Sequence, residues 1–314
     1  MLSEFETSSS TVEKLTLLVF IAAIIIGNIC VFVTYFLRTS GKHWSHMFVL
    51  GMAFIDLFIG GFVLPMRFQS TYGSPLTSKL CAASSIGESC ALASVIYAIG
   101  FMIYTRLYYL KNASTSFHRR YPLMLLLVSW VASFIFYGIP FMTNNSIDHL
   151  KVVSSTTNAA FYCTTYAIFI HHPNWMTYTE IGIMYSLPFL CILIGLLFLI
   201  RHLCQSKPIE LDKMQRKEYY QQKQMTWHVV ILTITFICLW LPWATTRILI
   251  IFYKTNEIQH TLQITYYILI LKSAVFPVLY ASTNASFRGS FAIYRHKRIT
   301  FNNRVWTVNE SLRN

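Results

Sequence analysis

The chain has 314 residues, of which 55% are hydrophobic and only 12% are charged, and its formal net charge is +13. Soluble globular domains carry about 25% charged residues, so this composition excludes an ordinary water-soluble protein. The basic excess does not indicate a nucleic-acid partner, because the basic residues lie in short links between apolar blocks, where lipid headgroups attract them.

Seven apolar blocks follow one another along the chain, and each is long enough as a helix to cross a hydrocarbon core of about 30 Å. They cover Leu15–Leu37, Met47–Met66, Cys81–Leu110, Leu123–Phe141, Tyr178–Ile200, Thr226–Tyr253 and Leu262–Ser282. In lipid each block must satisfy its own backbone hydrogen bonds, so each is predicted to be a helix. The first block is too long for a cleavable signal peptide and has no small-residue cleavage site after it. The fold class is therefore an all-α membrane protein, a seven-transmembrane-helix bundle.

The distribution of Lys and Arg predicts the orientation of this bundle. The links after the first, third and fifth blocks and the C-terminal tail hold most of the basic residues. The positive-inside rule then places residues 1–14 outside the cell, residues 15–282 in the membrane domain, and residues 283–314 in the cytoplasm. Within this tail, Asn284–Lys297 is predicted to form a short amphipathic cytoplasmic helix that lies on membrane lipid. We expect a multi-pass protein of the plasma membrane.

Interior prolines predict that several helices are bent. They are Pro65, Pro140, Pro188, Pro242 and Pro277. A proline removes one backbone hydrogen bond and kinks its helix, and neighbouring helices satisfy the carbonyl that it frees. Five such residues in five blocks suggest bent helices around a cavity.

Polar residues inside the blocks carry a family resemblance. In chain order they are Gly27-Asn28; Leu50, Ala53, Asp56 and Leu57; Cys81 and Arg106; Trp130; Pro188; Phe236 and Cys238 to Pro242; and Pro277 to Tyr280, followed by Phe287-Arg288. Landmarks of this kind in this order, one set per block, resemble the rhodopsin-like family of G-protein-coupled receptors. The stretches around Leu37 and Pro65 look most like its biogenic-amine branch. The resemblance covers essentially the whole chain.

The resemblance implies several properties of this chain. A disulfide between Cys81 and Cys163 is expected on the oxidising outer side. The implied partners are a small extracellular ligand and a heterotrimeric G protein, and no cofactor is implied. Asp56, Arg106, Trp240, Pro277 and Tyr280 fall at the family's activation positions. The residues themselves add a glycosylation sequon at Asn144.

Two carboxylates are candidate ligand contacts. Glu88 occupies the place where amine receptors carry an aspartate, and a carboxylate at that depth needs a partner, which a ligand ammonium would supply. Glu180 lies on the outer part of the fifth block, and two carboxylates in one cavity favour a histamine-like or diamine ligand. The remaining candidates are aromatic and suit a cation through their ring faces: Tyr185, Trp240, Trp243, Tyr266 and Tyr267. The alternatives are that Glu88 is structural and that Glu180 faces water at the rim.

Departures from the family pattern limit these implications. Thr105 replaces the acid that normally precedes Arg106, which leaves open a noisy receptor or a weakly coupled one. Phe276 and Lys272 replace two asparagines of the seventh block. We expect Lys272 to form a salt bridge with Asp56 in place of a sodium ion, so that sodium does not modulate ligand affinity. Lys272 also raises an opsin interpretation, but it lies five positions before Pro277 rather than seven, which rotates the side chain by about 200°.

Three classes of function remain open. The leading one is a receptor for a small cationic ligand, a biogenic amine or diamine, that signals to a heterotrimeric G protein. The second is a receptor for a peptide or lipid, and the third is a seven-helix homologue with weak or no coupling. An enzyme is not expected, because no catalytic set or phosphate-binding loop is present, and seven scattered cysteines make no metal site.

Overall fold

The computed structural model describes residues 2–37, 45–72, 78–111, 120–143, 178–205, 213–253 and 256–283. All described elements are helical. They are α1 (Leu2–Leu37), α2 (Ser45–Phe58), η1 (Ile59–Val63), α3 (Leu64–Tyr72), α4 (Ser78–Lys111), α5 (Arg120–Thr143), η3 (Glu180–Ser186), α9 (Leu187–Gln205), α10 (Lys213–Phe252) and α11 (Asn256–Thr283). The elements η1 and η3 are π-helical segments that join their α-helical neighbours into continuous spans.

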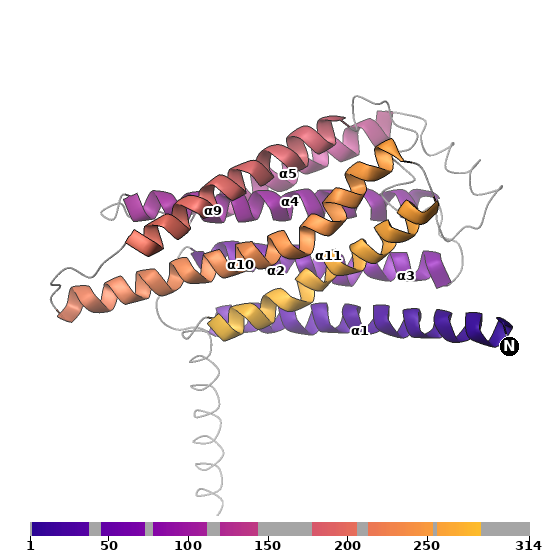
Figure 1. Ribbon diagram of the computed structural model, residues 1–314, viewed down its shortest axis with the longest axis horizontal. Coiled ribbons are helices and arrows are strands. Elements are labelled where there is room, and N and C mark those ends of the chain that lie inside the picture. Colours follow the sequence, from indigo (N-terminus) through magenta and orange to yellow (C-terminus); the bar gives the residue numbers. More distant parts are fainter. Residues whose placement is uncertain are drawn as a thin grey trace, which may run out of the picture.

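Seven helical spans of the described chain are long and apolar enough to cross a membrane, which confirms the predicted number. They are Thr11–Phe36, Met47–Tyr72, Ala83–Lys111, Tyr121–Ile139, Glu180–Gln205, Tyr219–Ile250 and Thr261–Thr283. Each overlaps one predicted apolar block. Figure 1 shows these helices running side by side along the long axis of the molecule.

The first helix is longer than expected. It begins at Leu2, although the apolar block begins only at Leu15. No proline or glycine interrupts the polar residues before that block, so the helical backbone continues past the lipid-crossing part. We call the end where α1 begins the N-terminal end of the bundle, and the other end the opposite end.

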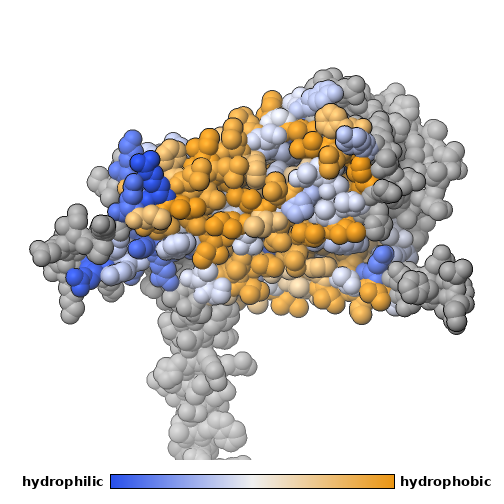
Figure 2. All heavy atoms as spheres, viewed as in Figure 1, coloured by the Kyte–Doolittle hydropathy of each residue, from blue (hydrophilic) through white to orange (hydrophobic). Residues whose placement is uncertain are grey.

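The helix α4 lies at the centre of the bundle. It contacts α2, α5, α9 and α10. Most of the apolar stretch of α4 is buried, whereas most of the apolar stretch of α1 is exposed. The outer helices turn large apolar side chains away from the bundle, among them Val19, Phe36, Leu127, Leu197 and Val278. Figure 2 shows hydrophobic residues covering the middle of the visible face, with hydrophilic residues gathered at the opposite end. This surface suits lipid around the middle and water at the ends.

The prolines disturb their helices in two ways. Pro242 and Pro277 lie inside α10 and α11. Pro65 and Pro188 directly follow the first residue after η1 and η3, so a π-helical turn precedes each of them. A π-helical turn changes the hydrogen-bonding register and bends the axis, which is a common way to absorb a proline in a helix.

Candidate functional site

A buried ion pair ties α2 to α11 in the middle of the bundle. Lys272 Nζ lies 2.8 Å from Asp56 Oδ1, and both side chains are 1% exposed. Ser273 Oγ donates a second hydrogen bond to the same oxygen at 2.6 Å. The predicted contact between Lys272 and Asp56 is therefore confirmed. A buried charge is costly without a partner, and here each charge is compensated by the other.

Gly27 and Asn28 of α1 both contact the segment of α11 around Pro277. Pro277 has no N–H to give to the carbonyl of Ser273, and Asn28 Nδ2 donates to that carbonyl at 3.1 Å. A Cβ atom on Gly27 would lie 3.1 Å from Cγ of Pro277, so the close approach of α1 and α11 depends on glycine. The carbonyl that the proline frees is thus satisfied by a neighbouring helix, as we predicted.

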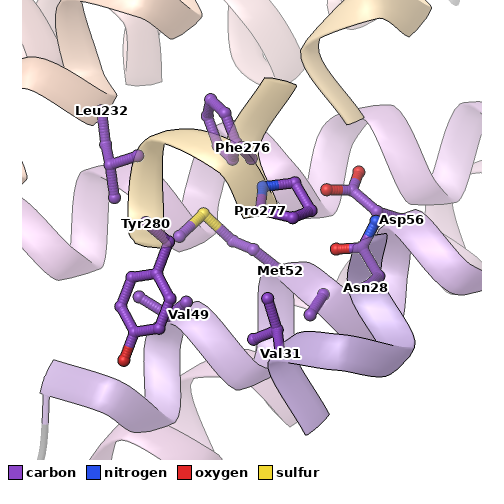
Figure 3. Close-up of a pocket in the computed structure, with 10 residues that line it drawn as sticks. Asn28, Val31, Val49, Met52, Asp56, Leu232, Phe276, Pro277 and Tyr280 are labelled. Atoms are coloured by element: carbon purple, nitrogen blue, oxygen red, sulfur yellow. The ribbon is translucent and has the colours of Figure 1, made fainter. Parts of the chain in front are cut away.

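A small cavity borders the ion pair. Its lining combines Asn28 and Asp56 with Phe276, Pro277 and Tyr280 from α11. Figure 3 shows Asn28 and Asp56 at one side of the cavity and Tyr280 at the other. Asp56 Oδ2 has no hydrogen-bond partner among the described residues, although Oδ1 has two. The carboxylate therefore keeps one acceptor oxygen unused beside the cavity.

Arg106 links α4 to α10 near the opposite end. It is fully buried, and Nε donates to Thr226 Oγ1 at 3.0 Å. Nη2 donates to Thr226 Oγ1 at 2.8 Å and to the carbonyl oxygen of Gln222 at 2.5 Å, while Nη1 donates to Gln222 Oε1 at 2.9 Å. The guanidinium is thus held by uncharged acceptors from a single helix.

Thr105 takes no part in holding Arg106. Its hydroxyl donates back to the carbonyls of Phe101 and Met102 within α4, at 2.7 and 3.1 Å. Loss of the usual acid therefore does not free Arg106, because α10 supplies the acceptors instead. The sequence alone left open how the replacement by Thr105 affects this arginine, and it gave no sign of the acceptors on α10.

At the N-terminal end, Glu88 lies at a junction of three helices. Arg67 Nη1 from α3 lies 3.5 Å from Glu88 Oε1 of α4, and the two side chains are 15% and 6% exposed. The guanidinium carbon of Arg67 lies 3.7 Å above the ring of Tyr266 from α11. Tyr266 is itself buried and lies close to both charged groups. We call these three residues the Glu88 cluster.

Glu180 lies in a second polar cluster, built from α5, η3 and α10. Its Oε1 accepts hydrogen bonds from the hydroxyls of Tyr137 and Tyr185, each at 3.2 Å. Arg247 Nη2 lies 3.6 Å from Glu180 Oε2. The residue is 1% exposed, so the expectation of a glutamate that faces water at the rim is wrong. The Glu180 carboxylate can be buried between three helices because Tyr137, Tyr185 and Arg247 supply its hydrogen-bond and charge partners.

Aromatic residues pack between α9, η3 and α10. Trp240 contacts Phe189, Phe236 and Tyr185, with ring centroids 5.0, 5.9 and 6.0 Å apart. Trp243 meets Tyr185 edge to face at 5.9 Å. The indole N–H of Trp240 is buried and has no hydrogen-bond partner in the described part of the chain. This tryptophan carries an unused donor inside an otherwise apolar group.

The remaining predicted site residues have varied outcomes. Tyr267 is partly buried and packs against the core next to Tyr266. Tyr280 is buried, with its ring centroid 5.2 Å from that of His228. Cys81 is buried at the start of α4. Cys163, Asn144 and the segment Asn284–Lys297 lie outside the described residues, so the disulfide, the glycosylation and the amphipathic helix stay predictions.

Sequence reasoning missed the basic partners of both carboxylates. Arg67 directly follows the predicted second block, which ends at Met66, and Arg247 lies inside the predicted sixth block. The available signal was their position: each arginine lies within a helix that is otherwise apolar. A charge in such a place generally pairs with another polar group.

One family model matches this arrangement of helices and landmarks. The match covers residues 27–280 and belongs to the 7 transmembrane receptor (rhodopsin family). It includes Asn28, Asp56, Arg106 and Pro277, whose contacts join neighbouring helices. No curated protein matches the sequence significantly. The matched segment spans all seven helices, and the chain therefore belongs to the rhodopsin family of seven-transmembrane receptors.

Proposed function

We propose that this receptor binds a small extracellular ligand with a cationic amine at the Glu88 cluster and signals to a heterotrimeric G protein. The observation that carries the proposal is Glu88 itself, a carboxylate that is 5% exposed where three helices meet. A carboxylate is expensive to bury there, and such residues within membrane spans generally mark ligand or ion sites. In this proposal the N-terminal end faces the cell exterior and the protein resides in the plasma membrane.

The charges around the two glutamates do not favour a diamine as the ligand. It assumed two carboxylates available to two ligand cations. Glu88 and Glu180 each have an arginine within 3.6 Å, so neither is an isolated negative charge. We therefore assign the ligand amine to Glu88 alone, with Tyr266 as the neighbouring aromatic residue and Trp240 as a further aromatic candidate.

Activation would shift the relative positions of α4 and α10. Arg106 bonds α4 to α10 at the opposite end. A ligand that binds better when these two helices separate would expose that end to a G protein. Trp240 lies on α10 between the ligand end and Thr226. Its packing against Phe189 and Tyr185 supplies a route by which a change near the ligand alters α10.

A specific observation favours a second candidate. Arg67 already balances Glu88, so Glu88 has a purely structural explanation, and the ligand could be a peptide or lipid that contacts other residues. A seven-helix homologue that does not couple is the third candidate, supported by Thr105 and Phe276.

Second-messenger output in cells separates these candidates. We would express the wild type and Glu88→Ala and apply a panel of biogenic amines. An amine response that is lost in Glu88→Ala supports the proposal, because the ammonium loses its counter-charge. Glu13→Gln is the matched control, since Glu13 is an exposed carboxylate at the same end that accepts a hydrogen bond from the Tyr72 hydroxyl. A response that Glu88→Ala leaves intact would contradict the role of Glu88.

A further inference from the structure

We propose that the ligand is a zwitterion, with a carboxylate next to its amine, and that it binds across Arg67 and Glu88. The inference rests on the proposed function, because it assumes that the amine of the ligand meets Glu88. It adds that Arg67 receives an anionic group of the same molecule. The chemical class is an amino acid or a close derivative, rather than the amine that remains after its carboxylate is removed.

Charge balance at the N-terminal end carries the first step. Among the described residues, two buried carboxylates there, Glu88 and Glu180, are matched by partly buried Arg67 and buried Arg247. A monocation bound at Glu88 would leave one positive charge without a partner in a water-poor setting, which is strongly unfavourable. A zwitterion adds one charge of each sign, so the cluster stays neutral when it binds.

The distance between the two groups carries the second step. Arg67 Nη1 and Glu88 Oε1 are 3.5 Å apart, whereas hydrogen bonds between charged groups measure about 2.7–2.9 Å. The buried pair of Lys272 and Asp56 reaches 2.8 Å in the same molecule. The ion pair of Arg67 and Glu88 is therefore longer than that of Lys272 and Asp56, as is the pair of Arg247 and Glu180 at 3.6 Å. A guanidinium has five N–H donors, so Arg67 can bind a second carboxylate beside Glu88.

Tyr266 carries the third step, because it lies close to both charged groups. Its ring lies 3.7 Å from the guanidinium carbon of Arg67, and the residue is buried close to Glu88. A ligand that separates Arg67 from Glu88 by a small amount would leave the stacking of Arg67 on Tyr266 in place. The cluster thus presents a positive and a negative group side by side, which matches a molecule whose ammonium and carboxylate are attached to the same carbon.

The second cluster is a poorer site for the same ligand. Glu180 already accepts hydrogen bonds from Tyr137 and Tyr185, and the side chains of Glu180 and Arg247 are only 2% and 8% exposed. Arg67 is the most exposed of the four charged groups, at 15%. A ligand therefore reaches the Glu88 cluster with less disruption of existing bonds.

The test uses pairs of compounds that differ by one carboxylate. They are histidine and histamine, tyrosine and tyramine, tryptophan and tryptamine, and ornithine and putrescine. Binding is measured as the rise in melting temperature of the purified full-length receptor, a readout that does not require G-protein coupling. We expect at least one amino acid to bind about 10-fold or more tightly than its amine, as expected for a bond to a charged group.

Variants then assign this preference to Arg67. Arg67→Gln should reduce or reverse the preference for the amino acid, because Glu88 keeps its charge and the counter-charge is gone. Arg67→Lys should keep part of it, and Lys14→Gln, which removes another cation at the same end, should leave it unchanged. Folding is checked by the surface level of each variant.

The outcomes separate this inference from the function on which it rests. A wild type that prefers the amine in every pair overturns the zwitterion and leaves the amine proposal standing. A preference for an amino acid that survives Arg67→Gln also overturns it. A wild type that binds no member of any pair overturns both proposals and favours a peptide or lipid ligand.

Discussion

Lys272 and Asp56 depend on each other because both are almost fully buried. A lone charge in this position would be uncompensated, and breaking such a pair typically costs about 3–5 kcal/mol. The ammonium is covalently attached to α11, so it is always present at Asp56, unlike a dissolved ion. We therefore interpret Lys272 as an internal cation that fills the role of sodium at this carboxylate.

This interpretation predicts how the protein responds to sodium. The melting temperature of the purified wild type should be the same when sodium chloride is replaced by potassium chloride at constant ionic strength. Lys272→Asn should melt at a lower temperature and should gain stability in sodium, because Asp56 then lacks its cation and the cavity beside it can admit one. The double variant Asp56→Asn with Lys272→Asn is the control and should show no difference. A sodium effect in the wild type contradicts the interpretation.

At the scale of elements, Arg106 makes most of the polar contacts between α4 and α10, and Gln222 Nε2 adds a hydrogen bond to the Tyr109 hydroxyl at 3.3 Å. Arg106 donates to Thr226 and Gln222 and to no carboxylate in the described chain. Hydrogen bonds from a charged group contribute about 1.5–3 kcal/mol each, so this contact can favour the closed arrangement of the two helices. We therefore expect low basal signalling in the absence of ligand, although Thr105 replaces the acid before Arg106.

Removal of the acceptors should therefore raise basal signalling. We expect Thr226→Val combined with Gln222→Ala to increase ligand-independent second-messenger output about 10-fold, since a loss of about 1.4 kcal/mol shifts a two-state equilibrium by that factor. Output is normalised to the amount of receptor at the surface. Gln221→Ala is the matched control, because Gln221 is exposed one position away on the same helix. An unchanged basal output in the double variant, with Arg106 still required for any ligand response, would mean that this contact does not restrain activation.

At the scale of the whole molecule, orientation follows from the placement of charge around an apolar belt. The middle of the bundle is hydrophobic in Figure 2, and hydrophilic residues gather at the opposite end. Basic residues near that end include Lys111, Arg201, Arg216 and Lys223. Such residues are generally retained on the cytoplasmic side during insertion, so we expect the N-terminal end to lie outside.

A cysteine test examines this orientation together with the predicted disulfide. An epitope tag at the N-terminus should bind antibody on intact cells, and one at the C-terminus only after permeabilisation. Cys81→Ser and Cys163→Ser should each lower surface expression. The double variant should be no worse than either single variant, because each substitution removes the same disulfide bond. Cys238→Ser is the control, since Cys238 is a free, exposed thiol. Additive losses in the double variant would contradict the pairing.

Much of the fold and part of the site were accessible from the sequence by itself. The number of spans follows from the length of apolar blocks, since lipid forces each block to be a helix. The contact of Lys272 with Asp56 was also predictable, because the family resemblance places Lys272 near the level at which Asp56 would hold a sodium ion. Gly27, Asn28 and Pro277 were recognised as landmarks, although their shared role at the Ser273 carbonyl was not.

Only the tertiary structure decided which groups satisfy the other buried charges. Arg67 and Glu88 come from different helices, and their meeting depends on the bend near Pro65 and on the rotation of α3 and α4, which no local pattern specifies. The same holds for Glu180 with Arg247 and for Arg106 with Thr226. Apolar periodicity determines that a helix crosses the membrane, but contacts between helices depend on their relative rotation and depth, which arise from packing of the whole bundle.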